Sequence, residues 1–255
     1  MSARRLYRHT AGSKHFKSFT VTVKETDLWI AVPPDSRSEV LPTRVEQLVW
    51  RVRRELERYI EFHPDFALTR EPYLVEGTAP ELVLQMARAG NTAGVGPMAA
   101  VAGALAEIVG KQLLRHCSQV IVENGGDIFM KVVERASIAI LAGKSPLSNK
   151  IALLIEPGGN SCGICTSSGT AGHAYSEGRA DAAVILSPSA ALADAAATAV
   201  ANRVQGPADL EQALSFARSI EGVTGALLIC GERIALWGQI QIQPLAPEQR
   251  LRPER

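Results

Sequence analysis

The sequence predicts an α+β fold in which antiparallel sheets and helices are stacked in layers. Short apolar runs typical of strands come in groups, and segments with helical spacing come in blocks, so the two do not alternate regularly along the chain. Hydrophobic residues make up 46% of the 255 residues, which is enough for a full core, and no linker divides them. We therefore expect one domain over residues 1–255, with residues 244–255 as a flexible tail.

The first predicted elements are a hairpin and a long helix. Apolar and polar residues alternate over 19–23, and a second apolar run follows at 28–32, which predicts two paired strands. Thr43 and Glu46 have the spacing of a capping box, and apolar residues then keep helical spacing to about residue 61. The charged residues on the opposite side of this helix are interpreted as a solvated face.

The rest of the chain predicts further helices and strands. Residues 63–77 read as a loop, followed by a helix from Thr78 to Arg88 that Gly90 ends. Residues 157–180 are rich in Gly, Ser and Thr and predict a functional loop. The remaining predicted helices begin at 97, 188 and 207, and the remaining predicted strands lie at 119–123, 127–133, 137–143, 151–156, 182–187, 225–230 and 233–240.

Residues 97–106 and 188–197 resemble each other. Both segments begin with Pro, which suits the first position of a helix, and continue with small apolar residues that allow two backbones to approach closely. We infer an internal duplication whose two small-residue helices pack together, with Gly103 at the position that matches Asp194. The alternative is that two Ala-rich helix starts look alike by chance.

Asp194 and Thr198 stand four residues apart on one face of the second of these helices. A lone carboxylate and a hydroxyl are costly to bury on an alanine face unless they bind something. Mg²⁺ suits this pair because it takes oxygen ligands and often completes its shell with phosphates. Alternatively, Asp194 caps or pairs within the core, and the Thr198 hydroxyl bonds to the carbonyl four residues earlier.

Two loops carry further candidate residues. Asn124-Gly125-Gly126-Asp127 follows a strand, and its glycines allow a backbone to approach a ligand closely, although a tight hairpin turn is favoured on this motif alone. Thr166-Ser167-Ser168-Gly169-Thr170 offers N–H and O–H donors to a phosphate, but it lacks the lysine and the spacing of a P-loop. An ordinary turn explains the second loop equally well.

The cysteines and histidines give weaker signals. Cys162 and Cys165 have CxxC spacing, but no second pair completes a zinc site, so we interpret them first as buried thiols and second as a metal or redox pair. Cys117 and Cys230 lie among apolar residues and are expected in the core. His173 is the one histidine near a suggestive loop. A Ser-His-Asp hydrolase is set aside because the chain has no Gly-x-Ser-x-Gly motif.

The composition of the chain limits the classes of binding partner that we expect. With 27 basic and 26 acidic residues, the net charge is +1 and no basic stripe predicts nucleic acid binding. No apolar run is long enough for a membrane span, and the first residues lack the apolar segment of a signal peptide. We therefore expect a cytoplasmic protein with reduced thiols that binds a small molecule. The long helix and the hairpin edges could support a homodimer.

Taken in order, Asn124–Asp127, Thr166–Gly169 and the helix with Pro188, Asp194 and Thr198 resemble the ApbE-like superfamily, whose best-known members are FAD:protein FMN transferases. The resemblance is strongest over residues 93–200 and is closest to a compact branch. It implies an ApbE-like fold and a flavin or nucleotide ligand.

The resemblance also implies roles for individual residues. Asp194 and Thr198 would hold Mg²⁺ with a backbone carbonyl from residues 93–102, while His173 and Asp127 are the implied catalytic residues. The residues implied to line the FAD site are Asn124, Gly125, Gly126, Asp127, Thr166, Ser167, Ser168 and Gly169.

Three family segments differ here. The Met-Gly-Thr segment that contacts flavin and the His-Ile-Ile-Asp-Pro-Arg segment have no counterpart, and Gly103-Ala-Leu-Ala-Glu107 stands where the family has Gly-Tyr-Ala-Val-Asp. Two functions therefore stay open. The first is Mg²⁺-dependent FMN transfer or phosphoanhydride cleavage, in which a protein threonine attacks and AMP leaves. The second is a non-catalytic protein that binds a flavin, a nucleotide or another cofactor.

Overall fold

The structure, a computed structural model, describes residues 16–36, 40–157, 159–168, 178–246 and 250. Its helices are α1 (Leu41–Phe62), α2 (Asp65–Leu68), α3 (Glu81–Ala93), α4 (Val101–Leu113), α5 (Ala190–Ala201) and α6 (Leu210–Ser219), with 3₁₀ turns η2 (Pro97–Ala100) and η3 (Pro207–Asp209). Its strands are β1 (Lys17–Val23), β2 (Thr26–Val32), β3 (Val120–Asn124), β4 (Asp127–Lys131), β5 (Ala136–Ala139), β6 (Ile151–Ile155), β7 (Cys162–Ser167), β8 (Ala182–Ser187), β9 (Gly225–Cys230), β10 (Arg233–Gly238) and β11 (Gln241–Pro244).

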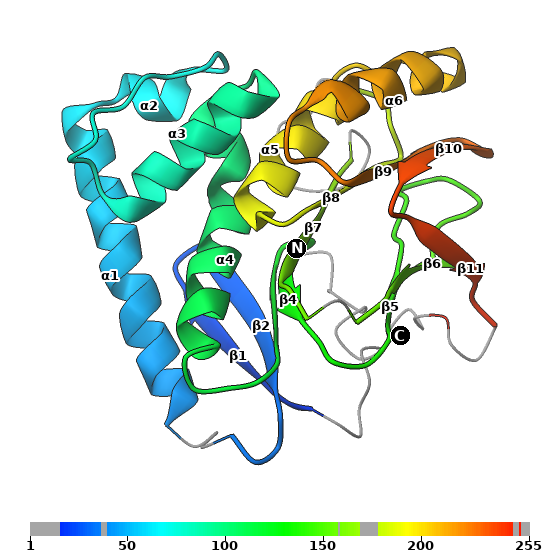
Figure 1. Ribbon diagram of the computed structural model, residues 1–255. Coiled ribbons are helices and arrows are strands. Elements are labelled where there is room, and N and C mark those ends of the chain that lie inside the picture. The colour runs from blue at the N-terminus through cyan, green and yellow to red at the C-terminus, as the bar shows by residue number, and fades with distance from the viewer. Residues whose placement is uncertain (1–15, 37–39, 158, 169–177, 247–249, 251–255) are drawn as a thin grey trace.

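Three layers build the molecule. Eight strands form one sheet in the order β1-β2-β3-β4-β7-β8-β9-β10, and three form a second in the order β11-β6-β5. Every neighbouring pair described in these sheets is antiparallel. The helices cover one face of the large sheet, and the small sheet lies on the other side (Figure 1). The predicted α+β class of layered antiparallel sheets is therefore confirmed.

The core has two parts, one on each face of the large sheet. Because side chains alternate along a strand, β7 sends Cys165 into the cluster under the helices and Ile164 into the cluster between the two sheets. The same alternation on β8 separates Ile185 from Val184. The large sheet is thus buried on both faces, which explains why β8 and β9 are nearly continuous apolar runs.

The long first helix confirms the predicted element but not its start. It begins at Leu41 after the N-cap residue Val40, and no side chain caps it. The capping box predicted from Thr43 and Glu46 is therefore wrong. Pro42 lies in the first turn, where its fixed φ suits a helix and its missing N–H has no cost, so the helix starts two residues earlier than predicted.

Three other predictions need correction. The predicted loop 63–77 contains the short helix α2. The helix expected to end at Gly90 continues to Ala93 and ends at Gly94, which has a left-handed φ of 74°. The predicted loop 157–180 contains β7, which pairs with β4 and β8 in the middle of the large sheet.

The two small-residue helices do pack against each other, as predicted. A Cβ on Gly103 of α4 would overlap the carbonyl oxygen of Ala190 at the start of α5, so only glycine allows this approach. The start of α5 is two residues later than expected, because Ser189 is the N-cap and Pro188 precedes it. The internal duplication itself stays a prediction.

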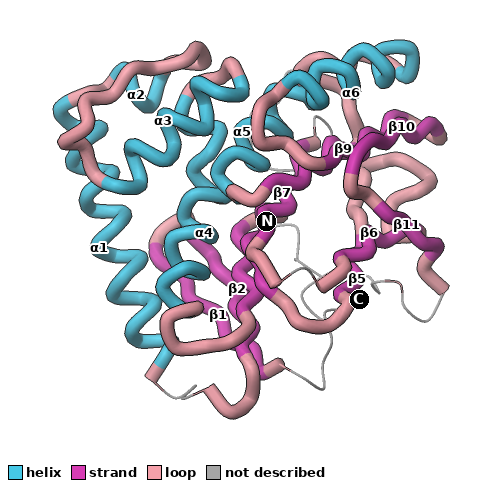
Figure 2. The backbone as a smooth tube through the Cα atoms, in the orientation of Figure 1, coloured by secondary structure: helices cyan, strands magenta, loops and turns pink. Residues whose placement is uncertain are grey.

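The backbone trace shows the helices gathered on one side of the sheets (Figure 2). In the described part of the chain, no single helix is both long and apolar enough to cross a membrane, although α3 and the segment Pro97–Leu113, bent by 105°, meet that test together by length and composition. Residues 247–249 and 251–255 of the predicted tail lie outside the described residues.

Candidate magnesium and nucleotide site

The Asn-Gly-Gly-Asp motif forms the two-residue turn of the β3–β4 hairpin. Asn124 pairs with Asp127, and Gly125 and Gly126 have φ angles of 71° and 110°, which disfavour residues with a side chain. Glu123 Oε1 accepts a hydrogen bond of 2.7 Å from the Gly126 N–H. The simpler interpretation of this motif is thus correct, and the turn also brings Asn124 and Asp127 to the start of α4.

The first turn of α4 is where three distant segments meet. Asn124 Nδ2 donates to the Ala102 carbonyl oxygen at 3.1 Å. The Asp194 carboxylate, from α5, accepts a hydrogen bond of 2.8 Å from the Gly103 N–H and a second from the Ala102 N–H. The structure therefore joins two of the predicted site residues, Asn124 and Asp194, through one turn of helix. It also gives Asp194 a capping role, which the sequence left open as an alternative.

Asp127 lies in the same region and is 8% exposed. Its carboxylate accepts a hydrogen bond from the Thr166 N–H and lies beside the Cys165 thiol. Burial, followed by the negative charge of Asp194, raises its pKa well above the usual range. Burial raises the pKa of Asp194 to about 7, and the N–H donors of Gly103 and Ala102 oppose this shift. Both groups are therefore poorly compensated as anions.

A divalent cation fits this pair of acids. Within the described residues, no lysine or arginine forms an ion pair with Asp127 or Asp194. The same residues contain no group of three His, Cys, Asp or Glu side chains that could hold a metal ion. A bound ion would need further oxygens from hydroxyls, carbonyls or a phosphate, and such a donor set matches Mg²⁺ better than zinc.

The hydroxyl-rich segment contributes one promising group. The Ser167 Oγ is buried and has no hydrogen-bond partner among the described residues, although a buried hydroxyl normally has one. Ser167 faces the helices with Cys165, whereas alternation along β7 turns the Thr166 side chain to the opposite face. The Thr166 backbone adjoins the glycine turn, because a Cβ on Gly126 would lie 3.9 Å from the Thr166 carbonyl oxygen. Thr166 thus approaches the site by its backbone.

The remaining predicted residues are placed less closely. Thr198 lies one turn after Asp194 on α5 and is half-buried. Between the described residues, no hydrogen bond joins its hydroxyl to the Asp194 carbonyl. Ser168 is half-buried just beyond β7. Gly169 and His173 lie outside the described residues.

The CxxC cysteines point to opposite faces of β7. Cys165 Sγ donates to the Ala190 carbonyl oxygen at 3.3 Å under the helices, and burial raises its pKa well above the usual range. Cys162 lines a cavity on the other face, and burial raises its pKa to about 11. Cys165 is buried, as the main interpretation predicts, whereas Cys162 is half-buried, and the alternating faces oppose a disulfide between them. Cys117 and Cys230 are buried, as predicted.

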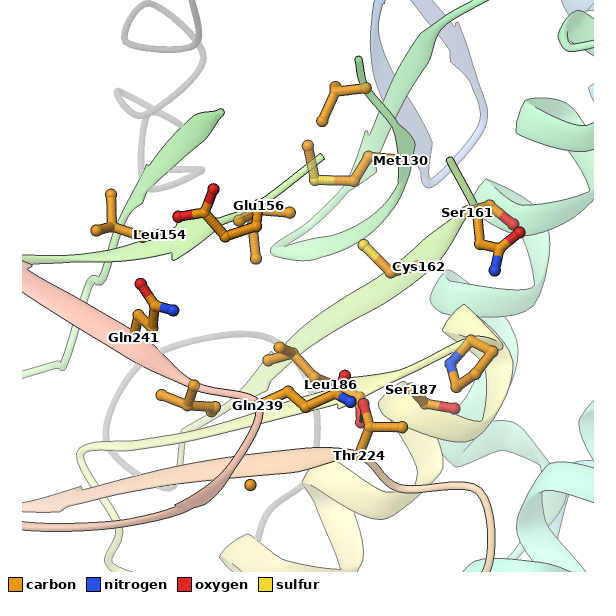
Figure 3. A pocket seen from close by; sticks show the side chains of 16 residues that line it. Met130, Leu154, Glu156, Ser161, Cys162, Leu186, Ser187, Thr224, Gln239 and Gln241 are labelled. Carbon is orange, nitrogen blue, oxygen red and sulfur yellow. Dashed lines mark hydrogen bonds between the residues drawn. The ribbon is translucent and has the colours of Figure 1, made fainter. Parts of the chain in front are cut away.

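The cavity beside Cys162 was not expected from the sequence. It has a volume of about 560 Å³ and lies between the large and small sheets, with Cys162 and Leu186 pointing into it (Figure 3). None of its described lining residues is a lysine or arginine, and Asp194 is not among them. The cavity is therefore distinct from the carboxylate site and does not suit a phosphate group.

Comparison with known proteins defines the class first. The chain shares its fold with flavin transferases of the ApbE type. The apo flavinyl transferase ApbE of Pseudomonas stutzeri matches 88% of this chain and 94% of its own, with a TM-score of 0.57 and 15% identity. The flavin transferase ApbE from Vibrio cholerae matches 89% and 97%, with a TM-score of 0.56 and 18% identity.

The family follows from the sequence comparisons. The family model described as "AbpE bacteria" matches residues 8–242, so the chain belongs to this family. Among its relatives, the UPF0280 protein of Methanosarcina acetivorans is 43% identical over 190 residues, which is 74% of this chain and 75% of the relative. The UPF0280 protein of Methanocaldococcus jannaschii is 37% identical over 225 residues, or 86% and 90%. The resemblance seen in the motifs is thereby confirmed.

Sequence reasoning missed the polar residue that docks α4 on α5. Glu107 is 4% exposed, and its carboxylate binds the first turn of α5 through Ser189 and Ala191. One signal was present, since a glutamate among small apolar residues of a helix is unexpected unless it has a buried partner. That partner lies more than 80 residues away in sequence, where no local pattern indicates it.

Proposed function

We propose that this protein binds FAD or a related dinucleotide together with Mg²⁺ at the start of α4, and that it transfers FMN or cleaves the phosphoanhydride. The observation that carries the proposal is the pair of neighbouring carboxylates, buried Asp127 and half-buried Asp194, without a cationic partner among the described residues. An ApbE-type fold supports a flavin ligand.

The residues of the site have separate tasks in this proposal. Asp194 and Thr198 hold the metal, which supplies positive charge to the pyrophosphate when bound. Asn124 and the Gly125–Gly126 turn form a wall that a ligand can approach closely. Ser167 supplies an unbonded hydroxyl to a phosphate oxygen. Ser168 and Gly169 continue that segment and are proposed to line the ligand site as well.

Asp127 is the proposed proton carrier among the described residues. Burial and the charge of Asp194 raise its pKa, and its place beside Asp194 in the candidate site makes it a candidate for proton transfer. In the transfer reaction, a protein threonine oxygen bonds to the phosphorus of the FMN half, the phosphoanhydride bond breaks, and AMP leaves with the bridging oxygen. The threonine proton passes to a base, for which Asp127 and His173 are the candidates.

Product analysis tests the reaction. Incubation with FAD, Mg²⁺ and a threonine-containing acceptor peptide should release AMP in an amount equal to that of the flavinylated peptide. If the enzyme is a hydrolase, incubation with FAD and Mg²⁺ but without the peptide should give FMN and AMP. The variant Asp127→Asn should lose turnover but keep ligand binding. Release of AMP at an unchanged rate by Asp194→Ala would contradict the proposal.

Magnesium-dependent binding of FAD without any AMP release would favour a non-catalytic cofactor-binding protein. One observation favours this second candidate. Asp194 caps α4 through the Gly103 N–H, and this structural role accounts for the carboxylate without catalysis. We further propose that the protein works in the cytoplasm on a small-molecule ligand.

A further inference from the structure

Glu107 is a buried acid in the middle of α4 that the proposed site does not use. Its Oε2 accepts hydrogen bonds from the Ser189 hydroxyl at 2.9 Å and from the Ala191 N–H at 3.2 Å. Its Oε1 pairs with Lys111 Nζ at 2.6 Å, at the outer edge of the same helix. The inner oxygen therefore satisfies donors at the start of α5, where the helix itself cannot.

The two helices cap each other. Glu107 of α4 accepts from the first turn of α5, and Asp194 of α5 accepts from Gly103 in the first turn of α4. The two contacts are one helical turn apart, because Glu107 follows Gly103 by four residues and Asp194 follows Ala191 by three. Two polar contacts at this separation fix how far α5 slides along α4 and how it is rotated.

The packing around these contacts is made by small side chains. The buried surface of α5 consists of alanines and one valine, which have no long side chains to interlock with a neighbour. Ala190 lies between Gly103 and Gly163, and a Cβ on either glycine would overlap it. These glycine contacts fit Ala190 in one register, and the directional hydrogen bonds of Glu107 and Asp194 hold the two helices there, as buried polar groups do in other helix pairs.

We propose that Glu107 is a positioning residue for Asp194. By holding the first turn of α5 on α4, it keeps the Asp194 carboxylate at Gly103, beside Asn124 and Asp127. This inference rests on the proposed function for the importance of Asp194, but the positioning itself is a property of the apo protein and is measured separately.

Amide hydrogen exchange tests the positioning without metal or substrate. In Glu107→Ala, the Gly103 amide should exchange at least tenfold faster than in the wild type and approach its rate in Asp194→Ala. The matched control Lys111→Met removes only the outer ion pair and should leave Gly103 exchange within threefold of the wild type. The double variant Glu107→Gln with Lys111→Met keeps an oxygen that accepts from Ser189 and Ala191, and it removes the ammonium group that would face the new NH₂ group. Its Gly103 exchange rate should lie within threefold of the wild-type rate.

A merely local role gives a different result. If Glu107→Ala accelerates exchange of the Ala191 amide but leaves Gly103 within threefold, Glu107 only caps α5 and the proposal is wrong. Should Glu107→Ala not fold, Glu107→Asp, which retracts the carboxylate by one methylene, provides the same comparison, with at least threefold acceleration expected at Gly103 and no change contradicting the proposal.

Magnesium binding gives the second readout. Calorimetry with MgCl₂ and FAD should show at least tenfold weaker binding of Mg²⁺ to Glu107→Ala than to the wild type, at a temperature where both are folded. Equal affinity would overturn the positioning role. If the wild type binds no Mg²⁺, the proposed function fails, while the exchange comparison still decides whether Glu107 positions Asp194.

Discussion

Replacing Asp194 by asparagine should make the metal-free protein more stable at neutral pH and weaken the binding of Mg²⁺ and FAD. Asparagine keeps an oxygen that can accept the Gly103 N–H bond but carries no charge. Burial raises the pKa of Asp194 from 3.8 to about 7. Between these values the folded protein holds a proton that the unfolded chain has released, so stability falls as the pH rises.

The magnitude follows from that difference. Each pH unit in this window costs about 1.4 kcal/mol, so the two units from pH 5 to pH 7 cost about 3 kcal/mol. Because Asp194 is only half-buried in terms of its exposed surface, solvent screening reduces the expected change to about 1–2 kcal/mol. The variant lacks this dependence, and it also relieves Asp127, whose pKa the charge of Asp194 raises.

Urea unfolding at pH 5, 6 and 7 in the presence of EDTA measures the effect. The free energy of unfolding of the wild type should fall relative to that of Asp194→Asn by about 1–2 kcal/mol across this range. Asp65→Asn, a change of an exposed acid at the start of α2, is the control and should follow the wild type. A difference between wild type and Asp194→Asn that stays constant within about 0.5 kcal/mol would refute the reasoning.

Three further predictions concern single contacts. Ser167→Ala removes a buried hydroxyl that has no partner among the described residues, so the midpoint of thermal unfolding should stay equal or rise while FAD affinity falls; a clear drop in the midpoint would show that the hydroxyl is structural. Gly103→Ala places a methyl group on the carbonyl of Ala190 and should destabilise the protein by about 3 kcal/mol in urea unfolding, whereas a loss below about 1 kcal/mol would mean that α5 moves freely. Treatment with diamide should give no disulfide between Cys162 and Cys165 by mass spectrometry, because they face opposite sides of β7, and a linked peptide would contradict that placement.

Local patterns in the sequence predicted much of the fold. Alternation predicted the β1–β2 hairpin, and the Asn124–Asp127 turn between two apolar runs predicted the β3–β4 hairpin. The strand β7 was not predicted, because its glycine and small polar residues have the composition of a loop. Its strand conformation depends on hydrogen bonding to the neighbouring strands β4 and β8.

The candidate site was also predicted only in part. Asp194 stands out in sequence because a charge is rare among alanines, and its helix face follows from simple spacing. The contacts that position Asp194 come from segments far apart in sequence. Gly103 is 91 residues from Asp194, and the hydrogen bond between Glu107 and Ser189 joins residues 82 apart. The cavity between the sheets combines Cys162 with Gln239 and Gln241 from the end of the chain. No local pattern can predict such pairings, because they depend on how whole elements pack.

The most direct test of the proposed function is calorimetry of FAD binding, with and without Mg²⁺, to the wild type and to Asp194→Ala. The wild type should bind FAD more tightly with Mg²⁺, and the variant, still folded, should lose this dependence. Binding that is equal with and without Mg²⁺, or no binding of FAD to the wild type, would contradict a magnesium and dinucleotide site at the start of α4.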